Sequence, residues 1–228
     1  MIMKGDRLEE WNEESPGQWN GIHFVPGSMN NIINYAIISN GNTAIRVDSA
    51  INNNPTLTIK NTIIKNMSSI GILGQGANIT GSNILINKCG QYTLACNIGG
   101  NYNFTHCTFA NYWNYNNRNT PSILLNNYYE DINNNIQIRD LQEATFINCI
   151  IYGPLSTEIS FQENTSGLFQ YKFENCLIKL DENINTNNNN NYSNVIINQS
   201  PEFIDGYENN LHLDSISPAI DSGKETLI

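Results

Sequence analysis

Apolar and polar residues alternate in short segments that recur along almost the whole chain. Six of these segments align position by position: INYAII (33–38), IKNTII (59–64), GSNILI (81–86), FTHCTF (104–109), FINCII (146–151) and FENCLI (173–178). Alternation with a period of two predicts a β-strand that buries one face. The segments start 26, 22, 23, 42 and 27 residues apart, which indicates a repeat protein with one enlarged repeat.

The aligned segments share columns of residue types. The third position is a bend residue in each: Tyr35, Asn61, Asn83, His106, Asn148 and Asn175. Two positions earlier the column is mostly apolar: Ile33, Ile59, Gly81, Phe104, Phe146 and Phe173. Three positions later it is apolar throughout: Ile38, Ile64, Ile86, Phe109, Ile151 and Ile178. A second alternating segment precedes each of the six, at 19–24, 44–49, 69–74, 92–97, 122–127 and 158–163.

This pattern predicts an all-β protein, a single-stranded right-handed parallel β-helix of about six coils. Successive coils would stack about 4.8 Å apart, so that like positions lie above one another and inward residues form apolar ladders. Amide side chains stacked at the bend can donate to the next coil. We therefore expect a buried structural ladder, with histidine as one member, formed by Asn61, Asn83, His106, Asn148 and Asn175.

The chain has five cysteines, an odd number, so at least one of them is unpaired within the chain. Cys107, Cys149 and Cys176 share one column, and we interpret them as stacked buried thiols that behave as small hydrophobic residues. Strand stacking sets their Cβ vectors roughly parallel, which is poor geometry for a disulfide. Cys89 and Cys96 lie near successive bends, where a bridge stays an open alternative.

The chain divides into coils over 1–194 and a C-terminal segment over 195–228. An insertion at about 110–140 explains the long fourth spacing, and residues 183–194 form an Asn-rich loop. After residue 195 the repeat fades. We expect the final segment to cap the open end of the stack, because an exposed last coil presents unpaired strand edges.

The composition argues against several partners. The 228 residues carry a formal net charge of -10 with only 11 Lys and Arg, so clustered phosphate contacts to nucleic acid and binding to an anionic membrane surface are not expected. No apolar run reaches the length of a membrane span, and membrane association would need an anchor outside this chain. No cofactor is expected.

Several stretches resemble known proteins. The coils resemble the pectate-lyase-like superfamily of parallel β-helix proteins, and GDRLEEW (5–11), PGQWNGIHF (16–24) and NNIINYAIISN (30–40) look like surface β-helix proteins of Bacteroides-type bacteria. The tail from Pro201 to Gly223 resembles the Ser-Pro-Ala-Ile-Asp-x-Gly ending of bacterial cell-surface β-helix proteins. The resemblance implies a secreted or surface protein. A signal peptide and further coils usually precede GDRLEEW, so we expect this chain to be an incomplete form.

The resemblance also directs attention to polysaccharide chemistry. Lyases with this fold use a Ca²⁺-binding carboxylate cluster and a basic residue, and hydrolases use close Asp residues. The motifs of both are missing here. Weak catalytic candidates are Arg46 and Asp48, two apart on one strand. They could form a polar site if the insertion folds over them and adds Arg118, Glu130, Asp131, Arg139 and Asp140. The alternative is that they are surface ion pairs and turn residues.

The insertion offers a different kind of site. Aromatic rings flanked by amides suit sugar binding, because the ring face covers apolar C–H groups while amides bond hydroxyls. The candidate ligand-binding residues are Tyr112, Trp113, Tyr115, Arg118, Tyr128 and Tyr129. Alternatively, these rings only pack the loop onto the coils.

We expect no metal site. His23, His106 and His212 are dispersed, and Asp205, Glu208 and Asp214 lack a recognisable Ca²⁺ spacing. Three functions remain open. The first is a non-catalytic surface solenoid that binds glycan or mediates adhesion. The second is a polysaccharide lyase or glycoside hydrolase with an atypical site, and the third is a structural segment of a larger surface protein. The oligomeric state stays open too.

Overall fold

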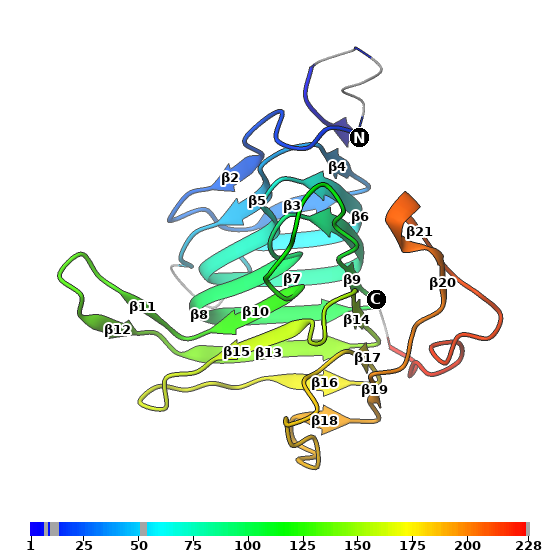
Figure 1. Cartoon of the computed structure of the whole chain (residues 1–228). Coiled ribbons are helices and arrows are strands. Elements are labelled where there is room, and N and C mark those ends of the chain that lie inside the picture. The colour runs from blue at the N-terminus through cyan, green and yellow to red at the C-terminus, as the bar shows by residue number, and fades with distance from the viewer. Residues whose placement is uncertain (7–8, 10–13, 51–53, 227–228) are drawn as a thin grey trace.

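The structure is a computed structural model that describes residues 1–6, 9, 14–50 and 54–226. The GDRLEEW stretch therefore falls largely outside the described residues. Seventeen strands join one sheet whose pairings are parallel, and the strands lie in a stack (Figure 1). The helical structure in the described ranges is a single 3-10 turn, η2 (Gly206–Glu208). No helix among the described residues is long and apolar enough to cross a membrane.

The stacked strands fall into three columns, defined by which strands pair. Column A contains β2 (Ile22–Phe24), β5 (Thr43–Val47), the starts of β7 (Ile70–Cys89) and β8 (Leu94–Thr105), β10 (Ile123–Asn126) and β15 (Ile159–Gln162). Column B contains β3 (Asn31–Asn34), the start of β6 (Leu57–Met67), the later parts of β7 and β8, β13 (Leu141–Ile147), β16 (Lys172–Glu174) and β18 (Tyr192–Ser193). Column C contains β1 (Ile2–Met3), β4 (Ile37–Ser39), the ends of β6 and β7, β9 (Thr108–Ala110), β14 (Ile150–Tyr152), β17 (Leu177–Ile178) and β19 (Ile196–Ile197).

The register confirms the aligned apolar columns. Ile33 pairs with Ile59, which pairs with Gly81, and the column continues without a shift through Phe104 and Phe146 to Phe173. The column that begins at Ile38 runs in the same way to Ile178. These side chains are buried, as an inward-facing ladder requires. The stacking also extends one level beyond the aligned segments, where Tyr192 pairs with Phe173 and Ile197 with Ile178.

The bend column explains the preference for asparagine at the third position. Tyr35, Asn61, Asn83, His106, Asn148, Asn175 and Asn194 all have φ between 48° and 55°. This left-handed region disfavours most side chains but is tolerated by asparagine. The expected side-chain ladder forms in part: Asn83 donates to Asn61 (2.8 Å) and Asn61 donates to Asn34 (2.9 Å). Lower in the column, Nδ2 of Asn148 contacts Nε2 of His106 (3.4 Å). The expected burial is wrong, because the bend lies at the outer corner of the stack and Asn83 is exposed.

The bend strain gives a first testable prediction. Asn61→Ala is expected to lower the free energy of unfolding by roughly 1–2 kcal/mol, since an ordinary side chain is disfavoured by about that amount in the left-handed region. Asn61→Gly loses the same amide bonds but accepts the positive φ, so it should be less destabilising. Urea unfolding followed by circular dichroism measures both variants. Equal losses for alanine and glycine would mean that bend conformation contributes nothing.

The insertion forms two separate features around strand β10. Residues 111–122 make a loop on one side of the stack, while β11 (Tyr128–Glu130) and β12 (Ile136–Ile138) form an antiparallel hairpin that projects to the left in Figure 1. Buried amides fix the base of the hairpin. Asn126 accepts bonds from the amides of Ile98 and Tyr128, and Asn127 bonds the backbone of Asn164 in both directions.

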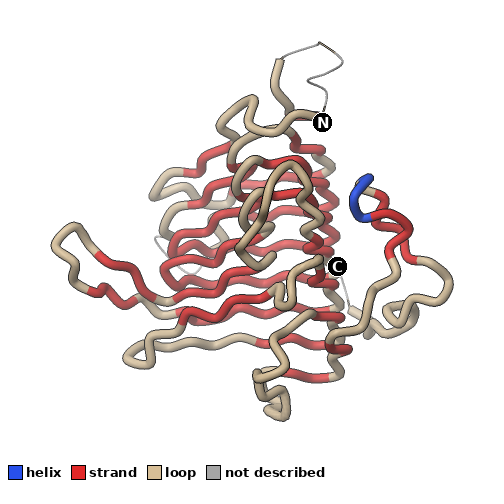
Figure 2. Tube along the Cα trace, viewed as in Figure 1, coloured by secondary structure: helices blue, strands red, loops and turns tan. Residues whose placement is uncertain are grey.

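The C-terminal segment lies along the side of the stack, not over its end. After β19 it passes through β20 (Phe203–Asp205), η2 and β21 (Asn210–Leu213), seen at the right of Figure 2. Asn87 of β7 donates to the carbonyl of Gly206 (2.8 Å). Further along the segment, Asn148 exchanges two bonds with the backbone of Lys224 (2.8 and 2.9 Å). The expected end cap is thus wrong. At the lower bends the amide side chain faces outward, and that of Asn148 bonds the tail.

In the interior, side chains of the same kind lie above one another in ladders. The rings of Phe104, Phe146, Phe173 and Tyr192 form a continuous stack with centroids 5.0 to 5.9 Å apart. Cys107, Cys149 and Cys176 are buried free thiols, as expected. Burial raises the pKa of Cys149 and Cys176 well above the ordinary value, so these thiols stay protonated and unreactive.

Candidate functional site

A polar hollow of about 450 Å³ lies where columns A and B meet, beside the base of the hairpin. Its polar lining comes from Ser49, Asn78, Asn101, Arg139, Asp140 and Gln142. Asn78 and Asn101 are register partners on adjacent levels, so their amides lie one strand spacing apart on the outer face. The hollow therefore presents amides and a hydroxyl beside one cation and one carboxylate.

A second hollow continues the same surface toward the last coils. It has a volume of about 300 Å³ and is lined by Gln142, Glu143, Thr145, Gln170, Tyr171 and Lys172. Gln142 lines both hollows, and we call the joined surface the polar groove. Outward residues of column B form its floor because inward and outward positions alternate along each strand.

The charged groups of the polar groove are already engaged. Glu143 accepts hydrogen bonds from Thr145 (2.9 Å) and from Asn103 (3.2 Å). Asp140 accepts from the backbone amide of Leu168 (2.9 Å). The Arg139 guanidinium lies over the ring of Tyr129, 5.6 Å from its centroid. These contacts hold the groups in place, which favours recognition of a ligand over proton transfer.

Arg46 and Asp48 form an ion-pair cluster with a residue that the sequence did not connect to them. Asp48 accepts from Nε of Arg46 (2.9 Å) and contacts Nε2 of His23 (2.8 Å), which lies opposite Arg46 on β2. Burial alone would raise the pKa of Asp48, but the hydrogen bonds from Arg46 and His23 outweigh it and lower that pKa. The carboxylate therefore stays ionised and does not act as a general acid near neutral pH. A catalytic role of Arg46 and Asp48 stays a prediction.

The insertion aromatics do not form one platform. Tyr112 packs edge-on against Phe203 and Tyr207 of the tail, with ring centroids 6.2 and 5.2 Å apart. Trp113 is only 7% exposed and donates to Asn116, and its ring contacts that of Tyr115 at 4.8 Å. Tyr115 is 45% exposed and donates its hydroxyl to the carbonyl of Glu14.

The remaining two tyrosines lie apart, on the hairpin. Tyr128 pairs with Ile138 and Tyr129 with Gln137, and both rings are partly exposed. Tyr129 lies against Arg139, which brings this end of the insertion to the polar groove. Ligand binding by the five aromatics stays a prediction. The geometry favours the hairpin pair over Tyr112 and Trp113, which are engaged in packing.

Arg118 is buried, so the expectation that it faces a ligand is wrong. Its side chain is 3% exposed and bonds both carboxylate oxygens of Glu158 (2.7 and 2.9 Å). Glu158 is itself fully buried and also accepts from the amide and hydroxyl of Ser122. Arg118 also donates to the carbonyl of Asn111. The pair therefore fixes the loop 111–122 onto column A.

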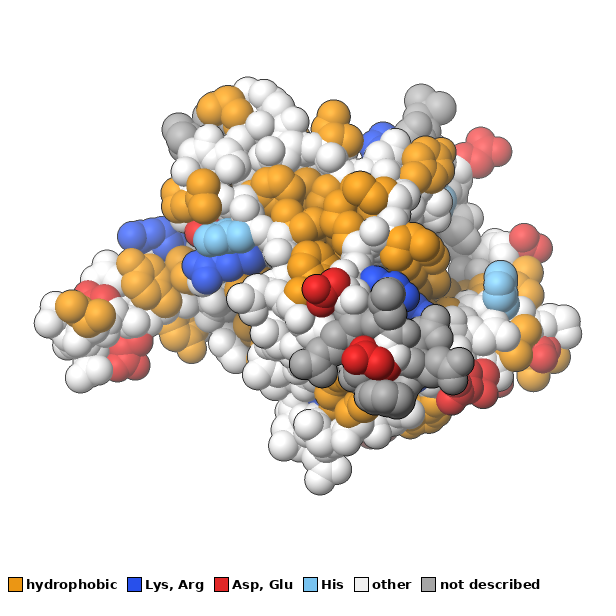
Figure 3. Space-filling model, turned by 90° about the horizontal axis from the view of Figure 1, so that it is seen from above, with side chains coloured by type: hydrophobic (Ala, Val, Ile, Leu, Met, Phe, Trp, Pro, Cys, Tyr) orange, Lys and Arg blue, Asp and Glu red, His pale blue; other side chains and the backbone are white. Residues whose placement is uncertain are grey.

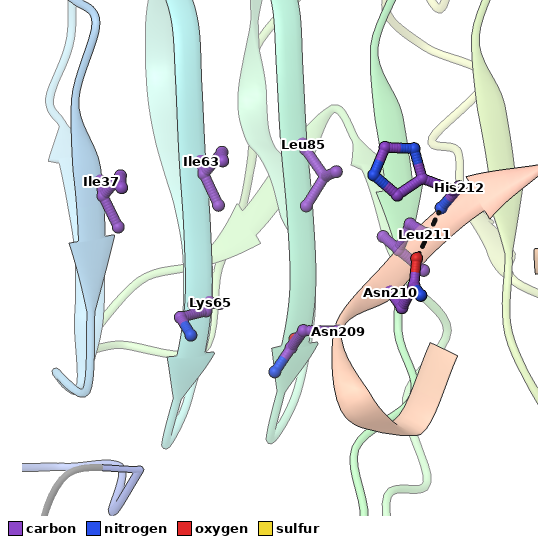
Figure 4. Close-up of a pocket in the computed structure, with 8 residues that line it drawn as sticks. All are labelled: Ile37, Ile63, Lys65, Leu85, Asn209, Asn210, Leu211 and His212. Atoms are coloured by element: carbon purple, nitrogen blue, oxygen red, sulfur yellow. Dashed lines mark hydrogen bonds between the residues drawn. The ribbon is translucent and has the colours of Figure 1, made fainter. Parts of the chain in front are cut away.

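A larger hollow, of about 630 Å³, has a different chemistry (Figure 4). Its floor consists of Ile37, Ile63 and Leu85, which are register partners on the outer face of column C. Residues 209–212 of the tail form its wall. We call this hollow the apolar groove. It lies between the outward apolar residues of column C and the tail. Its apolar floor is accompanied by four polar lining residues, Lys65, Asn209, Asn210 and His212.

The acidic residues of the tail serve local structure. Asp205 accepts from the amide of Glu208 at the start of η2 (3.1 Å), and Asp214 accepts from the amide of Ile216 (3.2 Å). Across the described part of the chain, no group of three or more His, Cys, Asp and Glu side chains could hold a metal ion.

Sequence reasoning missed Asn78, Asn101 and Gln142 because it examined the outward positions of column A and the insertion. The outward positions of column B carried the signal. Thr58, Thr80, Asn103 and Thr145 are register partners there, and all four are hydroxyl or amide residues. No protein-family model matches the chain, and no curated protein and no solved structure matches it.

Proposed function

We propose that this chain is a right-handed parallel β-helix of a secreted or cell-surface bacterial protein, and that it binds a neutral glycan in the polar groove. Three columns of parallel strands, in which the apolar residues from Ile33 to Phe173 are register partners level after level, support the β-helix. The resemblance of the tail from Pro201 to Gly223 supports the cellular location. The observation that carries the binding function is the polar groove itself.

The chemistry of the groove suits hydroxyl-rich ligands. Asn101 and Gln142 line the first hollow, and an amide side chain carries N–H donors beside an acceptor, which suits a sugar hydroxyl. The side-chain oxygen of Asn101 already accepts from Asn103 (3.1 Å), so Asn101 would contribute its N–H groups. Partly exposed Tyr171 in the second hollow and Tyr129 beside the first provide ring faces for the apolar C–H groups of a sugar. Loop and hairpin elements around a rigid stack of strands are common places for such sites.

The charge of the protein selects among glycans. With a formal net charge of -10, the protein repels polyanions at low and moderate salt. In the groove, Arg139 and Lys172 are matched by Asp140 and Glu143, so it offers no excess of cations for uronate or sulfate groups. A neutral polysaccharide is therefore the proposed ligand class.

The hydrogen bonds that Glu143 and Asp140 accept favour binding of a glycan over its cleavage. Glycoside hydrolysis needs one carboxyl group that gives a proton and another that acts as base or nucleophile. Glu143 is held by Thr145 and Asn103, and Asp140 by the amide of Leu168. Both side chains act as hydrogen-bond acceptors in these contacts. A lyase or hydrolase with an atypical site is the competing proposal, and one experiment addresses both.

Native electrophoresis through gels cast with neutral or anionic polysaccharides tests the proposal. We expect retardation by at least one neutral polymer and none by polyanions. The double variant Asn101→Ala, Gln142→Ala should bind roughly tenfold or more weakly, because each lost hydrogen bond contributes about 0.5–1.5 kcal/mol. Gln91→Ala, an exposed amide on another bend, is the matched control and should bind like the unaltered protein.

Each other outcome has a defined meaning. A zone along the protein's track in which the polysaccharide is no longer stained would mean that the protein cleaves the polymer, and the competing proposal of an enzyme would replace that of binding alone. Equal retardation of the double variant and the control would move the site away from the polar groove, and Tyr115, Tyr128 and Tyr129 would be replaced next. Absence of retardation on every polymer would reject glycan binding and favour a structural segment of a larger surface protein.

A further inference from the structure

The outer face of column B repeats along the stack as regularly as the core does. Thr58, Thr80, Asn103 and Thr145 are register partners on successive levels, and each carries a hydroxyl or an amide. All of them are partly exposed, and we call them the polar row. Viewed from above, hydrophobic side chains gather in the middle of the molecule, while backbone and uncharged polar groups make up much of its rim (Figure 3).

A second row of outward side chains lies beside the polar row and belongs to the polar groove. Asn78, Asn101 and Glu143 are register partners, and each comes two residues before a member of the polar row. Side chains two apart on a strand lie on the same face, so the two rows run side by side along the stack. The groove and the polar row therefore form one surface that extends across levels, not along a single strand.

Hydrogen bonds between the two rows hold these side chains in fixed orientations. Asn103 donates to Asn101 (3.1 Å) and to Glu143 (3.2 Å), and Thr145 donates to Glu143 (2.9 Å). The hydroxyl oxygen of Thr145 can still accept a bond, and the N–H groups of Asn101 can donate. Side chains that are already ordered lose little conformational entropy when a ligand binds, which favours binding at this surface.

The dimensions of the polar groove indicate the size of its ligand. The lining of its two hollows comes from five successive levels, from Ser49 after β5 to Lys172 in β16. The four intervals between these levels, at about 4.8 Å each, span roughly 19 Å, which is longer than a disaccharide. A ligand that lies across the levels meets groups of the same kind at each step, whereas one that follows a single strand does not.

We propose that the polar groove binds an interior stretch of a linear neutral polysaccharide that runs along the stack, with successive sugar residues on successive levels of column B. This inference rests on the proposed function and adds the direction and the length of the ligand. A linear polysaccharide repeats its hydroxyl groups from residue to residue, as the stack repeats its hydroxyls and amides from level to level. The polar row continues to Thr80 and Thr58, so the polymer can extend past the two hollows.

Isothermal titration calorimetry with oligosaccharides of graded length tests this arrangement. Partial acid hydrolysis and size fractionation of the neutral polymer that retards the protein in native gels supply chains of two to eight sugar residues. We expect the hexasaccharide to bind at least about tenfold more tightly than the disaccharide, because each added level contributes further hydrogen bonds. The affinity should stop rising once the chain fills the groove and the polar row.

Thr80→Val tests the direction of the ligand, because Thr80 belongs to the polar row but is not among the residues that line the two hollows. The variant should bind the hexasaccharide at least about threefold more weakly, through the loss of one hydrogen bond, and the disaccharide as before. Thr108→Val is the matched control, since Thr108 is a partly exposed strand residue of column C. It should bind both ligands like the parent, and both variants should keep the thermal unfolding transition of the parent.

The outcomes separate this inference from the proposed function. Retardation by a polymer, together with equal affinities for the disaccharide and the hexasaccharide, would reject the arrangement along the stack but not glycan binding. Equal effects of Thr80→Val and Thr108→Val on the hexasaccharide would reject the arrangement as well. If no polymer retards the protein, glycan binding fails, and this inference fails with it.

Discussion

Replacing Glu158 by alanine is expected to lower the free energy of unfolding by roughly 3–5 kcal/mol, the range for breaking a buried ion pair. Glu158 is fully buried and joins Arg118 to Ser122 through four hydrogen bonds from side chains and backbone. The alanine variant leaves the Arg118 guanidinium buried without its counter-charge. Urea unfolding followed by circular dichroism gives the loss, and limited proteolysis should show earlier cleavage in the loop 111–122.

Two comparisons separate the buried pair from electrostatics in general. Lys65→Met removes a more exposed pair with Glu14 and should change the free energy of unfolding by less than about 1 kcal/mol. The double variant Arg118→Met, Glu158→Leu removes both charges and should recover much of the loss, because apolar replacements of a buried pair are often neutral. If Glu158→Ala were no more destabilising than Lys65→Met, the pair would not anchor the loop.

The repeat was readable from the sequence because a stacked fold imposes the same constraint at every level. An apolar residue two positions before the bend recurs from Ile33 to Phe173, and each is the register partner of the next. The level that follows the six aligned segments was not predicted. Its pattern is reduced to Tyr192, Asn194 and Ile197, and it comes directly after an Asn-rich loop.

The path of the tail and the location of the site could not be read in the same way. Both depend on outward residues, which no ladder constrains, and on which of them a distant segment covers. Asn87 on β7 and the bend residue Asn148 hold Gly206 and Lys224 of the tail, and the repeat pattern predicts neither contact. The sequence predicts Arg118 as a ligand-binding residue because it lies among aromatic and amide residues, which suit a sugar site. Its partner Glu158 lies 40 positions away, and only the fold brings the two together.

The second large effect is expected in the aromatic stack of the interior. Phe146→Ala should lower the free energy of unfolding by about 3–5 kcal/mol, the usual cost of removing a buried phenylalanine side chain. Phe146 lies between Phe104 and Phe173, with ring centroids 5.7 and 5.0 Å away, and Phe109 meets its edge at 6.0 Å. The rigid strands on both sides limit collapse into the cavity, so the midpoint of urea unfolding should fall markedly.

Matched substitutions show whether this loss comes from the stack or from phenylalanine removal as such. Phe146→Leu keeps most of the apolar volume but loses the stacked ring, so its loss should be smaller than that of alanine. Phe203→Ala removes the same side chain from the tail, where Phe203 is only partly buried and contacts Tyr112 edge-on, and should cost about 1 kcal/mol. Because neighbouring levels share Phe146, its alanine variant should unfold in one transition at lower urea. A separate early transition would instead mean that the levels on either side of Phe146 unfold independently, and that the core is not continuous across it.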